Sequence, residues 1–306
     1  AEALRNALGN ATVDGNVVTL TGIVNLSSTL NITGGTMILD LNGKTIIYDR
    51  TGTQENATAI NVNGGNIVIK NGTIETYAAN GQNNGWNTKG GNGYNATAVV
   101  FNSGKVSLLS MSLKAIPGKG GSGQNFWGQS NPGNDGSPWV VDAEGNNTLG
   151  DVVPYGAYFS NPSDVKYTEK GEGINQQDAI VSLTQYNIAY NTNGGTTTVQ
   201  GTPSYTIETT DFILPTVTKN GYTVDWTYNG NPVNPTALPT TADRVASKDM
   251  TFVATWTPVS YKVVYDVDGG VALPDSSYNI ETALTTLPTP QREGYVFDGW
   301  YRGNQK

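Results

Sequence analysis

Internal repetition constrains the fold of this 306-residue chain more than any other feature of its sequence, because a repeated segment folds as a repeated structural unit. Ala-Thr-Ala-Ile at residues 57–60 returns as Ala-Thr-Ala-Val at residues 96–99, an offset of about 39 residues. After each copy comes a turn containing Gly, and the alternating apolar residues that follow correspond in order: Ile67, Ile69 and Ile74 with Val106, Leu108 and Leu113. Such runs, closed by Asn- and Gly-rich turns, predict parallel strands stacked in register with these six side chains pointing inward.

The composition agrees with a chain built from strands and turns. Only 14% of residues are charged, 37% are hydrophobic and 38 are Gly, a mixture too apolar for a disordered chain and poor in helix-forming residues. The net charge of −8 argues against a nucleic-acid partner and against an anionic membrane surface. No apolar run approaches the roughly 18 residues of a membrane span, so we expect no membrane insertion in this segment.

The first block of the chain resembles the right-handed parallel β-helices of the pectate-lyase-like superfamily. The resemblance is carried by Val-Val-Thr-Leu-Thr-Gly at residues 17–22, Leu-Asp-Leu-Asn-Gly-Lys-Thr-Ile at 39–46 and Ile-Lys-Asn-Gly-Thr-Ile at 69–74. It implies an all-β fold in which residues 1–184 form a short right-handed parallel β-helix, a solenoid, and it implies nothing about activity. Leu4 and Leu8 have the spacing of one helix face, which predicts a short helix covering the open end of the solenoid.

Two Gly- and Asn-rich loops, residues 77–95 and 117–138, interrupt the repeats, and loops of this length are uncommon unless they are functional or disordered. Their aromatic side chains lie among Asn and Gln residues, the mixture with which proteins stack sugars and hold their hydroxyl groups. The candidate ligand-binding residues are Trp86, Tyr94, Phe126, Trp127 and Trp139. The alternative is that these rings only anchor the loops against the side of the solenoid, since exposed and packed rings look alike in sequence.

A second pair of copies fills the rest of the chain. Tyr-Asn-Ile-Ala-Tyr-Asn-Thr-Asn-Gly-Gly at residues 186–195 returns as Tyr-Lys-Val-Val-Tyr-Asp-Val-Asp-Gly-Gly at 261–270, and Leu-Pro and Gly-Tyr motifs follow in both copies. This order resembles the Listeria–Bacteroides (internalin-type) repeat of bacterial surface proteins. The resemblance implies tandem small β-grasp-like modules, the first at residues 185–259 and the second at 260–306.

We expect the second module to be incomplete. The first copy closes with Phe-Val-Ala-Thr-Trp-Thr at residues 252–257, and no equivalent follows the Gly-Tyr motif of the second copy at residues 294–295. Two explanations stay open: the chain is a fragment of a longer protein, or a neighbouring molecule donates the missing strand and links subunits into a fibre. The opening residues Ala-Glu-Ala likewise indicate a mature or trimmed N-terminus.

The residue types present exclude several chemistries. The chain contains no Cys and no His, so it has no disulfides, thiolate nucleophiles, Ser-His-Asp triads or zinc sites of the usual kind. The acidic residues of the first block are scattered, so we assign no catalytic residue and predict no enzyme. Asp-Val-Asp-Gly-Gly at residues 266–270 suggests a calcium loop, but the first copy has Asn-Thr-Asn-Gly-Gly, and a turn explains both. We therefore expect neither a metal nor a cofactor.

Seven N-glycosylation sequons lie in the first block. The acceptor residues are Asn10, Asn25, Asn31, Asn56, Asn71, Asn95 and Asn146. In an organism that glycosylates Asn they would mark outward-facing turns, whereas in a bacterium without general N-glycosylation they carry no meaning.

These features together predict a secreted, non-enzymatic adhesin displayed on the cell surface. The β-helix head would bind a glycan or a surface glycoprotein, and the repeats would act as a stalk. One alternative is a structural subunit of a surface layer or filament, whose partners are copies of itself. A second alternative is a polysaccharide-cleaving β-helix enzyme.

Overall fold

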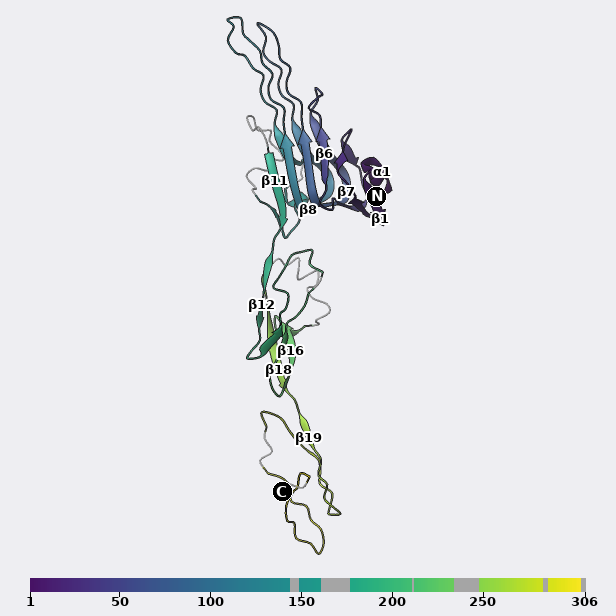
Figure 1. The fold of residues 1–306 in the computed structure, drawn as a ribbon, viewed down its shortest axis with the longest axis vertical. Helices are drawn as coiled ribbons and strands as arrows, with labels where there is room; N and C mark the ends of the chain where they lie inside the picture. Colours follow the sequence, from purple (N-terminus) through teal and green to yellow (C-terminus); the bar gives the residue numbers. More distant parts are fainter. Residues whose placement is uncertain (144–148, 161–176, 211, 234–247, 283–285, 304–306) are drawn as a thin grey trace. The chain divides into compact units, whose positions relative to one another are not determined.

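The structure is a computed structural model that describes residues 1–143, 149–160, 177–210, 212–233, 248–282 and 286–303 (Figure 1). The chain divides into two compact units, Ala1–Gln185 and Tyr186–Lys306. The all-β prediction is confirmed, since strands make up 47% of the chain and helices 4%. Neither of the helices found in these ranges has the length and apolar character that crossing a bilayer requires.

The first unit is one large sheet with two short helices beside it. Its elements are α1 (Glu2–Leu8), β1 (Ala11–Asp14), β2 (Val17–Leu20), β3 (Val24–Asn25), β4 (Leu30–Ile32), β5 (Thr36–Asp40), β6 (Thr45–Asp49), β7 (Ala57–Tyr77), β8 (Ala96–Ile116), β9 (Pro138–Ala143), α2 (Leu149–Val152), β10 (Ala157–Phe159) and β11 (Gln177–Leu183). The main path through the sheet is β1-β2-β5-β7-β8-β11-β10, and β3, β4, β6 and β9 pair beside it. The pairs in the middle are parallel, and antiparallel pairs close both ends.

The two longest strands, β7 and β8, contain the two copies of the sequence repeat. They pair in parallel with Ala57 opposite Ala96, Ile67 opposite Val106, Ile69 opposite Leu108 and Ile74 opposite Leu113. Each of these side chains is at most 1% exposed. The register and the inward orientation predicted from the repeat are therefore confirmed. The pattern continues into the preceding strands, where Leu39 of β5 lies opposite Ile69 and Ile46 of β6 lies opposite Ile74.

A stack of three glycines marks one bend of these strands. Gly35, Gly65 and Gly104 all have positive φ, between 89° and 97°. A Cβ on Gly65 would lie 2.4 Å from the carbonyl oxygen of Gly35, and one on Gly104 would lie 2.5 Å from that of Gly65. Only glycine tolerates both the backbone conformation and the close approach, so the turn residues repeat with the strands.

Short antiparallel strands form both ends of the sheet. At the N-terminal end, Leu4 and Leu8 of α1 are buried in the core of the unit, which confirms the predicted short helix. Beside it, β1 pairs antiparallel with β2. At the other end, β11 pairs antiparallel with β8, and β10 with β11. Short end strands give a second chain less backbone to pair with.

In the described residues of the second unit, the first repeat has more strands than the second. Its elements are β12 (Tyr186–Asn191), β13 (Thr196–Val199), β14 (Ser204–Tyr205), β15 (Thr216–Thr218), β16 (Tyr222–Tyr228), β17 (Asn231–Pro232), β18 (Met250–Pro258), β19 (Tyr261–Val263) and β20 (Ser276–Tyr278). In the first repeat β18 lies between β12 and β16, and its Phe252 is fully buried in the core. In the described part of the second repeat, the strands are β19 and β20, which pair antiparallel.

Candidate functional site

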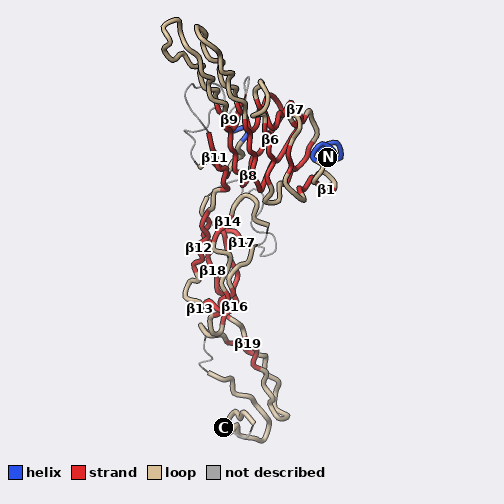
Figure 2. Tube along the Cα trace, turned by 45° about the horizontal axis from the view of Figure 1, so that its top comes forward, coloured by secondary structure: helices blue, strands red, loops and turns tan. Residues whose placement is uncertain are grey.

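The two long loops of the first unit are extended arms that project past the ends of the strands (Figures 1 and 2). The first arm, residues 78–95, joins β7 to β8, and the second arm, residues 117–137, joins β8 to β9. Each arm runs outward and returns, which gives four segments: residues 78–84, 88–95, 117–124 and 130–137.

Backbone hydrogen bonds cross all four segments in layers. In one layer Gly91 N donates to Gln82 O (2.9 Å), Gly121 N to Gly91 O (2.8 Å) and Gly133 N to Gly121 O (2.9 Å). Three residues nearer the sheet on each segment, the same chain of bonds recurs: Tyr94 N to Ala79 O (3.0 Å), Gly118 N to Tyr94 O (2.9 Å) and Gly136 N to Gly118 O (2.8 Å). A three-residue period is that of polyproline-II-like chains, in contrast to the two-residue period of a strand. We call this arrangement the glycine bundle.

Glycine is the residue that fits between the segments. A Cβ on Gly118 would lie 1.5 Å from the carbonyl oxygen of Ala79, and one on Gly121 would lie 1.9 Å from that of Gln82. On the returning segment, a Cβ on Gly133 would lie 1.9 Å from the carbonyl oxygen of Gly91. Close approach of backbones at a crowded axis is the reason collagen also needs glycine at every third position.

Asparagine side chains bind the backbone N–H groups that the bundle leaves over. Lys119 N donates to Asn80 Oδ1 and Ser122 N to Asn83 Oδ1, both at 2.8 Å. Asn134 N donates to Asn92 Oδ1 (3.0 Å) and Ser137 N to Asn95 Oδ1 (2.8 Å). The abundance of Asn in the arms therefore has a structural cause.

Three aromatic side chains gather where the two arms turn. Trp86 of the first arm is 64% exposed, and Phe126 and Trp127 of the second arm are 58% and 81% exposed. The ring centres of Trp86 and Phe126 are 5.6 Å apart, and those of Phe126 and Trp127 are 5.5 Å apart at an interplanar angle of 89°. We call these three residues the aromatic tip. Both arms contribute to it.

Short-range bonds hold the turns that carry these rings. Asn125 Oδ1 accepts from Trp127 N (3.0 Å) and from Gln129 N (2.9 Å), while Asn125 Nδ2 donates to Gln129 Oε1 (2.9 Å). In the first arm, Asn84 Nδ2 donates to Lys89 O at 2.6 Å. The turns are thus fixed by their own side chains, which limits the positions the rings can take.

The other two candidate residues lie apart from the aromatic tip. Tyr94 is half-buried at the base of the first arm, where it packs against the core. Trp139 is 1% exposed and lies opposite Thr97 in the pairing of β8 with β9. Its assignment as a ligand-binding residue is therefore corrected: it follows the second loop in sequence, but it is the second residue of a buried strand.

The predicted glycosylation acceptors take part in several structural bonds. Asn10 Nδ2 donates to Ile23 O (2.8 Å), and Asn71 Nδ2 donates to Asp40 Oδ1 (3.2 Å). Three others form bonds between copies: Asn31 Oδ1 accepts from Asn61, Asn56 Oδ1 from Asn95 N and Asn95 Oδ1 from Ser137 N. Asn25 is exposed on β3, and Asn146 lies outside the described residues. For the bonded acceptors, the sequence pattern has an explanation that needs no glycan.

Two acidic residues of the first unit, Asp40 and Asp49, hold turns. Asp40 Oδ1 accepts from Asn42 N at 2.9 Å. Asp49 Oδ1 accepts from the backbone N–H of Thr51 (2.8 Å) and from its hydroxyl (2.7 Å), and these bonds lower the pKa of Asp49. No group of three or more His, Cys, Asp or Glu residues that could hold a metal is found in the part of the chain that the structure describes.

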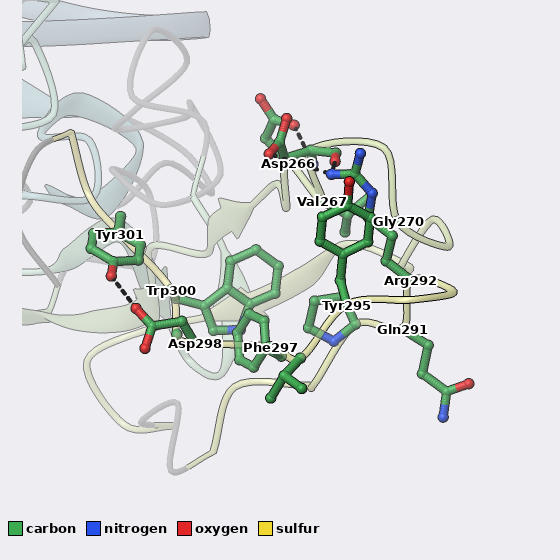
Figure 3. Close-up of a pocket in the computed structure, with 14 residues that line it drawn as sticks. Asp266, Val267, Gly270, Gln291, Arg292, Tyr295, Phe297, Asp298, Trp300 and Tyr301 are labelled. Carbon is green, nitrogen blue, oxygen red and sulfur yellow. Dashed lines mark hydrogen bonds and ion pairs between the residues drawn. The ribbon is translucent and has the colours of Figure 1, made fainter.

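A pocket of about 490 Å³ lies in the second repeat of the second unit (Figure 3). Its walls include Asp266, Arg292, Phe297 and Trp300, and the ring centres of Phe297 and Trp300 are 5.5 Å apart. In the first repeat, the corresponding Trp226 belongs to the closed core. The pocket therefore corresponds to the interior of a repeat, and we do not assign it as a ligand site.

Comparison with known proteins supports the repeats of the second unit. Residues 186–255 and 261–306 match the Listeria-Bacteroides repeat domain, which confirms the predicted resemblance. Internalin H of Listeria monocytogenes serovar 1/2a (strain ATCC BAA-679 / EGD-e) is 31% identical over 84 residues, which are 28% of this chain. The match spans 15% of the length of internalin H. No solved structure matches the chain.

Proposed function

We propose that the protein is a surface-displayed, non-enzymatic adhesin that contacts a glycan or a surface glycoprotein through the aromatic tip. The observation that carries this proposal is the grouping of Trp86, Phe126 and Trp127, three large rings that are each more than half exposed. Exposed apolar groups gathered in one place usually mark an interaction site. The glycine bundle and the bonded turns keep the rings in place without a ligand, so binding orders little of the chain.

We also propose that the first unit is a short right-handed parallel β-helix. The parallel pairs make three ladders: β4-β7-β8-β9, β2-β5-β7-β8 and β3-β6-β7-β8. From β2 to β9 the chain visits the three ladders in one repeating order, as a coil does. The single core that collects the inward side chains of all three ladders gives further support.

In this proposal the repeats carry the head away from the cell surface, and the protein is extracellular. Support comes from the match of residues 186–255 and 261–306 to the Listeria-Bacteroides repeat domain and from the partial similarity of the chain to internalin H. A folded tandem array suits a spacer, since each added module adds length.

Adhesion to a glycoprotein tests the proposal. Beads coated with the full chain are allowed to settle on immobilised mucin and on the same mucin after chemical deglycosylation. We expect retention on mucin that falls at least about tenfold when Trp86 and Trp127 are both changed to Ala, since exposed aromatic anchors dominate binding energies. The control is Tyr155→Ala, which removes another exposed ring, 68% exposed, outside the arms. Retention that the double variant does not change would refute the proposal.

A second candidate is a subunit of a surface layer or filament. The same exposed rings favour it when they pack on a different surface of the next copy, because such a head-to-tail contact repeats along a chain of subunits. Sedimentation of the full chain across a range of concentrations separates the two functions. Ring-dependent polymers that form without any ligand would support the filament, whereas a monomer that still adheres would support the adhesin.

A further inference from the structure

We propose that the ligand of the aromatic tip is an uncharged saccharide, stacked on rings from both arms in a composite site that exists only while the glycine bundle is intact. This inference rests on the proposed function and gives the chemical class of the ligand.

The exposed rings have the chemistry that binds the apolar faces of sugars. Trp127, at 81% exposed, presents nearly its whole side chain to solvent, and Phe126 lies edge-on to it. Trp86, tilted by 36° to Phe126, extends the aromatic surface onto the other arm. The ring centres of neighbouring members of the aromatic tip are 5.5 and 5.6 Å apart, so the three rings form one aromatic surface. A surface of several rings suits an oligosaccharide, which has several sugar units to stack. Amide side chains next to the rings in sequence, those of Asn87 and Gln129, are exposed and suit hydroxyl groups.

Charge argues for an uncharged ligand. Over residues 78–95 and 117–137 the charged side chains are Lys89, Lys119 and Asp135. Asp135 accepts a hydrogen bond from Gly120 N within the bundle. Lys119 lies beside Gly120 on the segment 117–124, near the sheet. Among the residues of the two arms, all of which the structure describes, Lys89 is thus the one charged residue near the turns. A sulfated or sialylated glycan, or an anionic lipid surface, is usually bound by several Lys or Arg side chains.

The site is composite because its rings come from different arms. Trp86 reaches Phe126 only if the first arm lies against the second, and the backbone bonds from Gln82 through Gly91 and Gly121 provide that contact. A substitution at an interior glycine is therefore expected to separate the rings without removing any of them. Loss of binding in such a variant would distinguish a composite site from three rings that act independently.

Binding of defined oligosaccharides tests the inference. The full chain is titrated by calorimetry with chitotetraose, cellotetraose and mannotetraose, with heparin as the anionic glycan probe and with vesicles of phosphatidylcholine and phosphatidylserine as the anionic lipid probe. We expect binding to at least one neutral tetrasaccharide and none to heparin or vesicles. Trp127→Ala and Gly121→Ala are each expected to raise the Kd about tenfold or more, a change of about 1.4 kcal/mol. Gly52→Ala, at a glycine with no atom within 4 Å of the added Cβ, is expected to leave the Kd unchanged.

The outcomes separate the inference from the proposed function. Ring-dependent retention on mucin combined with binding to heparin alone, to vesicles alone or to none of the probes overturns the uncharged saccharide and leaves the adhesin standing. Retention on mucin that is the same with and without the rings of Trp86 and Trp127 overturns the adhesin itself. Neutral-sugar binding that Gly121→Ala leaves intact, in a chain whose amide exchange shows the bundle opened, overturns the composite site.

Discussion

Single glycines decide whether the arms pack. At Gly121 an added methyl group would lie 1.9 Å from a carbonyl oxygen of the other arm, whereas at Gly85 it would meet nothing within 4 Å. Neither residue needs a positive φ, so the two positions differ mainly in what surrounds them. They make a matched pair for measuring what the interior of the bundle contributes.

We predict that Gly121→Ala destabilises the bundle by more than about 1 kcal/mol, because the backbone must move to admit the methyl group. Gly85→Ala should leave the bundle unchanged. Hydrogen exchange of the amides of Gly91 and Gly133 in both variants is the measurement. Equal protection in the two variants would contradict the packing described for the arms.

Tyr190 is expected to make the stability of the second unit depend on pH. Its hydroxyl donates to Thr202 O at 2.7 Å, and burial raises the pKa of Tyr190 to about 12. An unfolded tyrosine ionises near pH 10, so folding favours the neutral form. The contribution of this group is therefore complete below about pH 10 and disappears as the pH rises toward 12.

We expect the second unit of the full chain to lose stability between pH 10 and 12 in urea titrations. In Tyr190→Phe the loss over this range should be smaller, although the variant starts less stable because Thr202 O loses its donor. If the free energy of unfolding falls with pH at the same rate in the wild-type chain and in the variant, the ionisation of Tyr190 does not cause the loss of stability.

At the scale of elements, the repeated sequence predicted which strands pair, and the spacing of apolar residues within the repeat predicted which side chains are buried. The register of β7 and β8 follows because turns of similar sequence keep the two parallel segments at one offset, apart from a local shift between Val62 and Asn66. The regular packing of the arms does not follow from the sequence analysis, in which Gly- and Asn-rich segments of this length indicate functional or disordered loops. The signal was present in Gly118, Gly120, Gly121 and Gly123: glycine at two of every three positions suits a segment with neighbours on two sides. Trp139 was misassigned because the boundary between the second arm and β9 has no marker in sequence.

We predict that Ile69→Asp unfolds the first unit, because it places an unpaired carboxylate at a position that is 0% exposed. The expected loss is several kcal/mol in the free energy of unfolding. Asn66→Asp introduces the same group at an exposed position of the same strand, and its effect should stay within about 0.5 kcal/mol. Circular dichroism during denaturation compares the two, and similar midpoints would show that the register is wrong.

At the scale of the whole molecule, the residues that the structure describes form two hydrophobic cores that share no residue. One collects the apolar side chains of α1 and β2 to β11, and the other is centred on Phe252 and Trp226. Separate cores allow separate unfolding, since each unit can lose its packing while the other keeps its own.

We predict that Phe252→Ala lowers the stability of the second unit by about 3–5 kcal/mol, as large cavities in aromatic cores do. Amide exchange in β7 and β8 should stay at its wild-type level. Exchange measured by mass spectrometry on the full chain reports both units at once. Faster exchange in β7 and β8 of the variant would show that the two cores unfold together.

The glycine bundle also has a consequence for how stability changes with temperature. It is held by amide-to-carbonyl bonds and buries little hydrocarbon, unlike the sheet from which it extends. Exposing apolar surface raises the heat capacity of unfolding, whereas exposing polar surface lowers it. Opening of the arms should therefore carry a small or negative heat-capacity change, so that the arms do not loosen on cooling in the way a hydrophobic core does. An adhesive tip carried on such arms would keep its geometry in cold water.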